Sequence, residues 1–173
     1  MRRLDTGRAI VRPFVDADAP SLARHANDRA VWAHLRDRFP HPYALADARA
    51  FVTFLASRAE PVAWCVEVDG EAAGAVGLEA LADIEYVSAE LGYWLGQAHW
   101  GRGIMGGVVQ AFVPWAFAAR PDLERIFALP FADNTASCRL LARAGFVVEG
   151  RLRHSARKAG VLRDQVLYAS YRR

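Results

Sequence analysis

Cysteine is scarce in this sequence, and metal-binding spacings are missing from it. The 173 residues include two cysteines, Cys65 and Cys138, which lie far apart in the chain and have no histidine-rich segment beside them. Five histidines are scattered without the spacing of metal ligands. We therefore predict two buried thiols rather than a disulfide framework, a reducing compartment and no metal site.

Export and membrane-spanning segments are also lacking. The first residues, Met1-Arg2-Arg3, are charged, and no apolar stretch of signal-peptide type follows them. The longest apolar run, residues 106–119, contains Gln110 and Pro114 and is too short to cross a bilayer. These absences predict a soluble, cytoplasmic protein.

Charge of one sign is not in strong excess, since the formal net charge is +3. Basic residues gather in residues 151–163, but no aromatic side chains alternate with them as platforms for base stacking. This argues against nucleic-acid binding, and surface arginines also suit a small polyanionic ligand. With 53% hydrophobic residues, the chain is long enough for one well-packed domain, residues 1–173.

Strand-like and helix-like segments alternate along the chain, which predicts an α/β fold. Asp69-Gly70 is typical of a two-residue hairpin turn. Asp16 and Asp47 are predicted to start the first and third helices. The predicted strands are residues 8–14, 62–68, 72–78, 88–95, 125–129, 147–153 and 163–170, and the predicted helices are residues 17–27, 30–35, 48–58, 104–119 and 135–144.

The most informative segment is residues 100–107, Trp-Gly-Arg-Gly-Ile-Met-Gly-Gly, at the start of a predicted helix. Glycine lets the backbone approach a ligand closely, and the first amides of a helix, together with its dipole, favour an anion. Arg102 adds a formal positive charge. We therefore predict a phosphate-binding loop here.

Two kinds of ligand fit this loop. Gly101, Gly103 and Gly106 match the dinucleotide fingerprint G-x-G-x-x-G, and Asp133 follows the next strand as the acidic residue of that fingerprint would. The fingerprint requires a strand that runs directly into its first glycine, however, and residues 96–100 intervene here. A dinucleotide-binding oxidoreductase is therefore the less favoured alternative.

A second pattern occupies residues 134–150 and reads N-x-x-S-x-x-L-x-x-x-x-G-F-x-x-E-G. Asn134 is predicted to cap the helix that carries Ser137, and Gly145 to end it in a left-handed conformation. Together with the glycine loop, residues 39–43 and residues 89–95, this pattern resembles the GNAT acetyltransferase superfamily. Within it, the chain is most similar to the Rim-type ribosomal-protein alanine/serine N-acetyltransferases.

The resemblance implies a single-domain GNAT fold, with a mixed, mostly antiparallel sheet of about seven strands splayed in the middle and about four helices. It also implies acetyl-coenzyme A as cosubstrate, with the pyrophosphate on the glycine loop and the pantetheine arm beside the preceding strand. The family motif has Gln or Arg in place of Trp100 and Gly or Ala in place of Met105. The residues expected to bind the cosubstrate are Trp94, Leu95, Gly101, Arg102, Gly103, Ile104, Met105, Gly106 and Asn134.

The implied reaction is direct attack of a neutral primary amine on the thioester within a ternary complex. Roughly 10% of an α-amine is neutral at pH 7, so a weak base suffices. Glu90 is the candidate base, and Ser137 is the candidate proton donor to the leaving thiolate, because Leu141 stands where many members have a tyrosine. The acceptor is a protein N-terminus or a small amine, and it is expected to contact Arg36, Phe39 and Tyr43.

Several points stay open at this level. Glu90 can act as a base or only shape the pocket. If Glu90 and Ser137 face solvent, the chain is a non-catalytic acyl-coenzyme-A-binding module instead. The sequence specifies neither the acceptor amine, nor the acyl preference beyond acetyl, nor the oligomeric state, for which a homodimer is one option.

Overall fold

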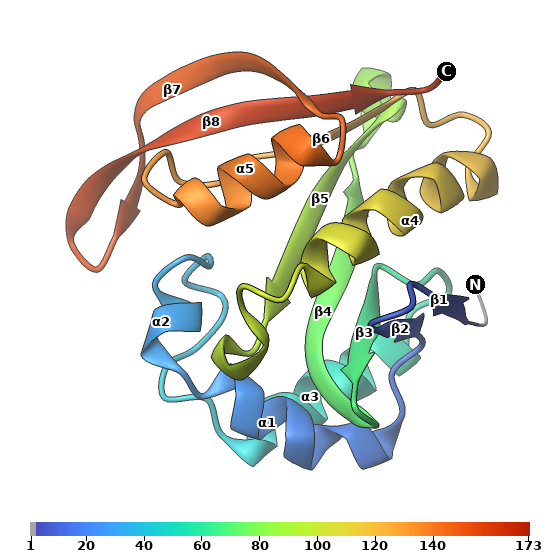
Figure 1. The fold of residues 1–173 in the computed structure, drawn as a ribbon, viewed down its shortest axis with the longest axis vertical. Coiled ribbons are helices and arrows are strands. Elements are labelled where there is room, and N and C mark those ends of the chain that lie inside the picture. Colours follow the sequence, from blue (N-terminus) through green and yellow to red (C-terminus); the bar gives the residue numbers. More distant parts are fainter. Residues whose placement is uncertain (1–2) are drawn as a thin grey trace. The chain divides into compact units, whose positions relative to one another are not determined.

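Strands and helices alternate in the computed structural model, which describes residues 3–173 (Figure 1). Met1 and Arg2, part of the charged N-terminal segment, lie outside the described residues. The eight strands form one mixed sheet in the order β1-β2-β3-β4-β5-β6-β8-β7. They are β1 (Leu4–Asp5), β2 (Ile10–Arg12), β3 (Ala63–Val68), β4 (Glu71–Ala80), β5 (Ser88–Leu95), β6 (Arg125–Ala128), β7 (Val147–Lys158) and β8 (Val161–Tyr171), and the helices are α1 (Ala19–Ala26), α2 (Arg29–Trp32), α3 (Leu45–Ala56), α4 (Ile104–Ala119) and α5 (Thr135–Arg143).

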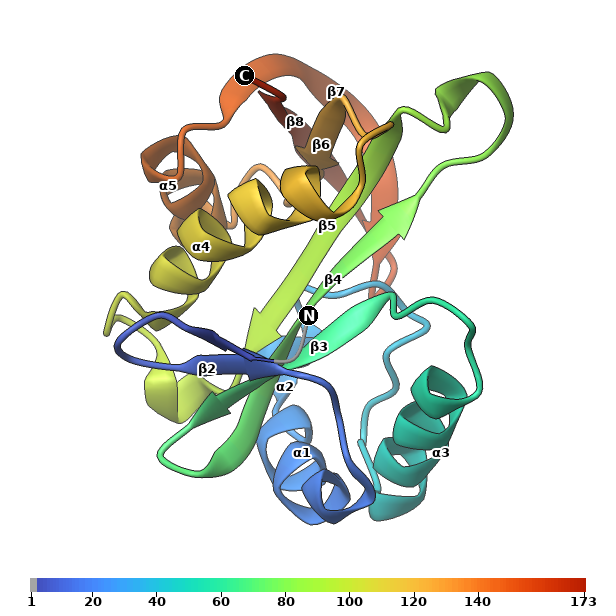
Figure 2. The ribbon, with the colours of Figure 1, turned by 90° about the vertical axis from the view of Figure 1, so that its right-hand side faces the viewer.

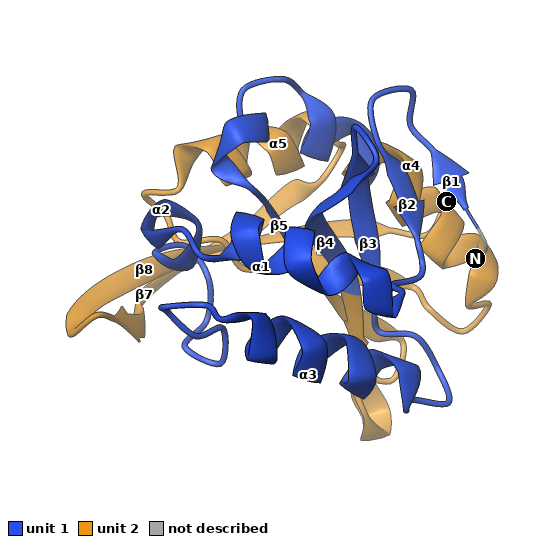
Figure 3. Cartoon of the chain, turned by 90° about the horizontal axis from the view of Figure 1, so that it is seen from below, with its two compact units in different colours: residues 1–77, 93–108 blue, residues 78–92, 109–173 orange. Residues whose placement is uncertain are grey.

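The chain is organised as two compact units, each made of two separate segments (Figure 3). Unit 1 comprises residues 1–77 and 93–108, and unit 2 comprises residues 78–92 and 109–173. The boundaries fall inside β4, β5 and α4 rather than in a polar linker. For this reason no composition shift in the sequence marks them.

Unit 1 is built on the antiparallel strands β1, β2 and β3 and the first part of β4. Asp69 and Gly70 close the β3–β4 hairpin with φ values of 52° and 83°, as a type I′ turn requires, so the predicted turn is confirmed. Helices α1 and α3 lie side by side (Figure 2). Leu22 of α1 and Val52 of α3 belong to a core cluster that also includes Cys65 of β3.

Leu22 is fully buried in this cluster. Truncation to alanine removes buried carbon atoms and leaves a cavity, so we expect Leu22→Ala to lower the free energy of unfolding by about 2–5 kcal/mol. Urea denaturation measures this loss. Phe54→Ala is the control, because Phe54 is 50% exposed on α3 and a surface substitution usually changes stability by about 0.5 kcal/mol. Equal losses in the two variants would contradict the assignment of the core.

Unit 2 contains the parallel strand pair. Ser88, Ala89 and Glu90 of β5 lie opposite Arg125, Ile126 and Phe127 of β6, and the described pairing ends there. β6 also pairs with β8, and β8 pairs with β7 in a long antiparallel hairpin (Figure 1). Glu90 therefore lies at the last residue pair between β5 and β6.

The structure confirms the α/β class and the predicted order of the elements, and it corrects the number of strands from about seven to eight within residues 3–173. β1 has only two residues, which is too short for an alternating pattern to reveal it. The closing hairpin is longer than predicted, because its turn is formed by Ala159 and Gly160, both at positive φ. Most of residues 154–162, which lie between the two predicted strands, are thus regular strand.

Two predicted helix starts are wrong. Asp16 lies in a short 3-10 helix, and Asp18 is the residue directly before α1. Arg12 pairs with the buried Asp18 carboxylate at 2.7 Å, a tertiary contact that no local pattern reveals. Asp47 lies inside α3, which begins at Leu45, and its carboxylate accepts a backbone N–H from the preceding turn.

Other local predictions are confirmed. Asn134 caps α5, since its Oδ1 accepts the Ser137 N–H at 3.1 Å. Gly145 follows α5 with φ +87°, as a left-handed helix end requires. Both cysteines are thiols, but only Cys65 is buried, and burial raises its pKa to about 12. Cys138 is half-buried, so the prediction of two buried thiols is wrong for this residue.

Candidate cofactor and active site

The glycine loop lies directly before α4, as predicted. Gly101 and Gly103 both have φ +73°, a conformation that residues with side chains rarely adopt. A Cβ at Gly101 or Gly106 would meet no atom within 4 Å, so at these positions the loop is open to an approaching ligand. The side chains of Ile104 and Met105 are buried, so these residues can contact a ligand only through their backbone amides.

Trp100 connects this loop to the end of β5. Its indole N–H donates to the Leu95 carbonyl at 2.7 Å. On β4, Gly74 allows close backbone contact, because a Cβ there would lie 2.3 Å from the Trp94 carbonyl oxygen. The Leu95 carbonyl is therefore bound by Trp100, and the Trp94 carbonyl lies close to the backbone of β4. The family resemblance places the pantetheine arm beside these two residues.

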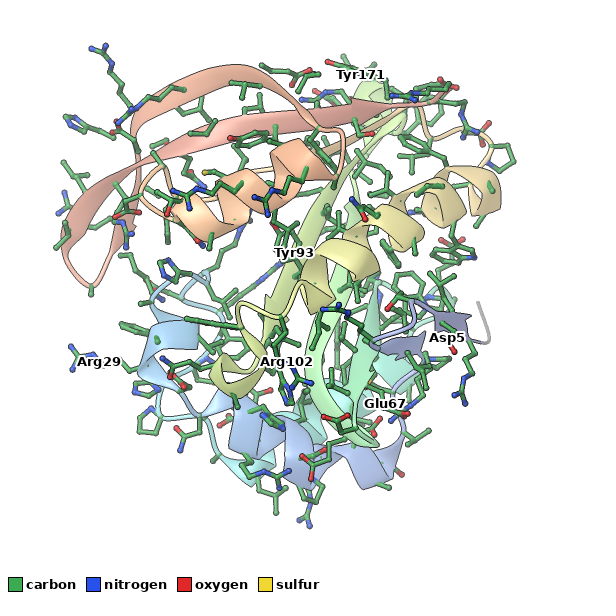
Figure 4. All side chains as sticks on the ribbon, viewed as in Figure 1. Asp5, Arg29, Glu67, Tyr93, Arg102 and Tyr171 are labelled. Atoms are coloured by element: carbon green, nitrogen blue, oxygen red, sulfur yellow. The ribbon has the colours of Figure 1, made fainter. Side chains whose placement is uncertain are left out.

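Arg102, labelled in Figure 4, is oriented by His99. Its Nη1 lies 3.2 Å from His99 Nδ1, and because a guanidinium can only donate, the histidine nitrogen accepts and the ring is neutral. Burial lowers the pKa of His99, and the charges of His25 and Arg102 lower it further. Asp69 Oδ2 is 4.0 Å from Arg102 Nη2. The positive charge of the loop is thus fixed in place and only weakly compensated.

Arg8 reaches the same loop, although nothing in the sequence pattern indicates it. Its Nη1 donates to the Arg102 carbonyl oxygen at 2.5 Å across 94 residues of chain. The histidines beside the loop are also unpredictable from the sequence, because they are scattered along the chain without the spacing of metal ligands. His25 and His99 have ring centroids 5.2 Å apart, a contact that depends on the tertiary fold.

The residues expected to contact the acceptor lie in the segment that follows α2. Phe39 contacts Tyr43, with ring centroids 4.8 Å apart, and meets Trp94 edge-on at 5.4 Å. Tyr43 is buried, and this burial raises its pKa to about 12, so its hydroxyl stays protonated at neutral pH. Arg36 is exposed. Phe39 and Tyr43 thus form a packed aromatic wall beside Trp94 of β5.

The candidate catalytic residues Glu90 and Ser137 both belong to unit 2, as does Asn134. Ser137 is half-buried in the first turn of α5, where its backbone is fixed by the cap. Glu90 is also half-buried, at the end of the parallel pairing of β5. A non-catalytic binding module is expected only if both residues face solvent. Neither Glu90 nor Ser137 is fully exposed.

The loop before α5 is fixed by β8. Arg163 forms an ion pair with Asp133 and places its guanidinium 4.4 Å from the centre of the Phe131 ring. Gln165 donates to the Leu129 carbonyl at 2.9 Å. Asp133, the residue that a dinucleotide site would need for a ribose, is therefore engaged by an arginine of the protein itself.

The candidate residues thus fall into two groups. The glycine loop, Trp94, Leu95 and the aromatic wall lie in unit 1, whereas Glu90, Asn134 and Ser137 lie in unit 2. Within residues 3–173, no three His, Cys, Asp or Glu side chains are grouped in a way that could hold a metal ion. No helix in the described part of the chain is long and apolar enough to cross a membrane.

Comparison with known proteins identifies relatives along the whole chain. Residues 8–147 match the acetyltransferase (GNAT) domain family. The uncharacterized N-acetyltransferase YoaA of Bacillus subtilis (strain 168) is 32% identical over 170 residues, which cover 96% of this chain and 94% of YoaA. The ribosomal-protein-serine acetyltransferase of Escherichia coli (strain K12) is 34% identical over 82 residues, 47% of this chain and 45% of that protein.

A similar fold is found among solved structures. RimL, the ribosomal L7/L12 alpha-N-protein acetyltransferase solved in complex with coenzyme A, superimposes with a TM-score of 0.83. The match covers 98% of both chains at 24% identity. At this level of identity, the likeness establishes the shared fold.

Proposed function

Because the chain belongs to the GNAT acetyltransferase family, we propose that it transfers the acetyl group of acetyl-coenzyme A to the α-amine of a protein N-terminus or to a small primary amine. The observation that carries this proposal is the glycine loop before α4, where Gly101 and Gly106 leave the backbone open to a ligand. Backbone amides at a helix start, with Arg102 beside them, suit the pyrophosphate of the cosubstrate. Trp94 and Leu95 would hold the pantetheine arm, and Asn134 would contact it from α5.

A protein N-terminus is the favoured acceptor. RimL and the Escherichia coli relative are named for acetylation of ribosomal proteins, which supports the same acceptor class here. The chemistry agrees, because at pH 7 roughly 10% of an α-amine is neutral, against about 0.04% of a lysine side chain. A half-buried carboxylate can therefore serve as the base for an α-amine, but it would be inefficient for a lysine side chain. Arg36, Phe39 and Tyr43 are proposed to form the acceptor side.

The proposed mechanism needs no covalent enzyme intermediate. Acetyl-coenzyme A supplies the thioester carbon; the amine nitrogen forms a bond to it, and the bond from carbon to sulfur breaks. Glu90 takes the amine proton through a water molecule, and the Ser137 hydroxyl donates a proton to the departing sulfur while it takes one from water. Glu90 then releases its proton to solvent, so both side chains return to their starting state. Both proton transfers are general acid–base steps of modest size, because an α-amine loses its proton readily and a thiolate is a good leaving group.

The proposal is tested by binding and turnover on the purified protein. Calorimetry with coenzyme A and with a nicotinamide dinucleotide should show preferential binding of coenzyme A. Thiol release with a panel of N-terminal peptides and small amines should then identify the acceptor class. Binding of coenzyme A without turnover on any amine would favour the acyl-coenzyme-A-binding module, and tighter binding of the dinucleotide would refute the proposal.

Glu90→Gln keeps the shape of the side chain and removes the base. We expect turnover to fall most at low pH, where the amine is mostly protonated, and to recover partly as the pH approaches the amine pKa near 8. Rates from about pH 6 to 9 measure this. Glu85→Gln, at an exposed position before β5, is the control. A constant ratio of variant to parent rate over this range would show that Glu90 only shapes the pocket.

A further inference from the structure

The turn between β1 and β2 has a fixed backbone conformation around Arg8. The Thr6 N–H and the Thr6 hydroxyl both donate to the Ala9 carbonyl, at 3.0 and 2.9 Å. The Gly7 N–H donates to Asp5 Oδ1 at 2.8 Å, and Gly7 has φ +77°, so a glycine is needed there. Arg8 is therefore presented from an ordered turn.

This turn lies against the glycine loop within unit 1. Besides the 2.5 Å hydrogen bond from Arg8 Nη1 to the Arg102 carbonyl, a Cβ at Gly103 would lie 3.9 Å from the same nitrogen. A Cβ at Gly107 would lie 4.0 Å from the Thr6 carbonyl oxygen. Two observations from different parts of the turn thus place the Arg8 guanidinium beside the backbone that is proposed to hold the pyrophosphate.

The charge of Arg8 has no acidic partner within residues 3–173. Arg8 is exposed, and no carboxylate in that range forms an ion pair with it. By contrast, Arg12 on the following strand is engaged by Asp18 and Glu67. A guanidinium has five N–H donors in a planar fork, so its one bond to the Arg102 carbonyl leaves others for a ligand.

Coenzyme A carries a diphosphate and a 3′-phosphate, whereas the loop itself contains one arginine. We propose that Arg8 is a phosphate ligand of the bound cosubstrate, held in place by its hydrogen bond to the Arg102 carbonyl. Planar, always-charged arginine suits this role, since it meets phosphate oxygens through paired N–H donors. The proposal rests on the proposed function and adds a binding residue from the other end of the chain.

The test compares coenzyme A affinity in charge-matched variants. Arg8→Gln keeps a polar side chain but removes the charge, so we expect about 10- to 100-fold weaker binding by calorimetry, and a weaker salt dependence. Arg8→Lys keeps the charge and should lose less. Arg49→Gln removes the same charge from an exposed position on α3 and should bind as the parent does. Circular dichroism melting checks that each variant folds.

Shorter ligands identify which phosphate Arg8 contacts. If the 3′-phosphate is the partner, 3′-dephospho-coenzyme A should bind the parent and Arg8→Gln equally. If the diphosphate is the partner, this ligand should show the same loss as coenzyme A. An unchanged affinity of Arg8→Gln for coenzyme A, or equal losses in the glutamine and lysine variants, would overturn the assignment.

The outcomes separate this inference from the proposed function. If the parent protein does not bind coenzyme A, the proposed function fails and the inference fails with it. Suppose instead that the parent binds coenzyme A, that Gly106→Glu abolishes this binding and that Arg8→Gln does not weaken it. The glycine loop is then the site, and Arg8 is not part of it. Only the inference is then wrong.

Discussion

Gly106→Glu is expected to weaken binding of coenzyme A by about 100-fold or more while the protein stays folded. A Cβ at Gly106 meets nothing within 4 Å, so the new side chain can leave the backbone without displacing protein atoms. It would extend into the space proposed for the pyrophosphate and place a negative charge there, and like charges brought together cost several kcal/mol. Calorimetry measures the affinity.

The same substitution should stabilise the fold slightly. Glycine in a helix is less favourable than other residues by about 0.5–1 kcal/mol, and an acidic side chain in the first turn is favoured by the helix dipole. The melting temperature of Gly106→Glu should therefore match or exceed that of the parent. Ala118→Glu introduces the same charge at the exposed far end of α4 and should leave affinity unchanged. Unaltered binding in Gly106→Glu would mean that the cosubstrate lies elsewhere.

Ser137→Ala is expected to lower kcat by about 10- to 100-fold with little change in the affinity for coenzyme A. The effect should be near the lower end, because the departing thiolate has a pKa close to that of a cysteine and leaves readily without full protonation. The substitution should not disturb α5, since the cap uses the backbone N–H of residue 137 and the Asn134 side chain. Single-turnover rates and calorimetry separate the two quantities.

Thr135→Ala is the matched control for this prediction. Thr135 is an exposed hydroxyl residue in the same helical turn, so its removal tests whether any hydroxyl there affects the rate. Its kcat should equal that of the parent. If Ser137→Ala also keeps full turnover, Ser137 is a structural residue of α5 and the proton reaches sulfur from another source.

Features that depend on neighbours in sequence were determined by the sequence alone. The Asp69-Gly70 turn, the Asn134 cap and the left-handed Gly145 are each decided within a few residues by backbone sterics and by local hydrogen bonds. The glycine loop before α4 is equally local. Because these motifs occur in a fixed order along the chain, the family and its fold were predictable from the sequence as well.

Features that depend on distant partners were decided only by the tertiary structure. Asp18 rather than Asp16 precedes α1, and its buried carboxylate is held by Arg12 of a neighbouring strand. The pKa of His99 is lowered because the fold half-buries it beside His25 and Arg102. Arg8 meets the glycine loop across 94 residues of chain. Such contacts cannot be predicted from periodicity or residue spacing. They join polar groups that come close together only when the strands and helices pack.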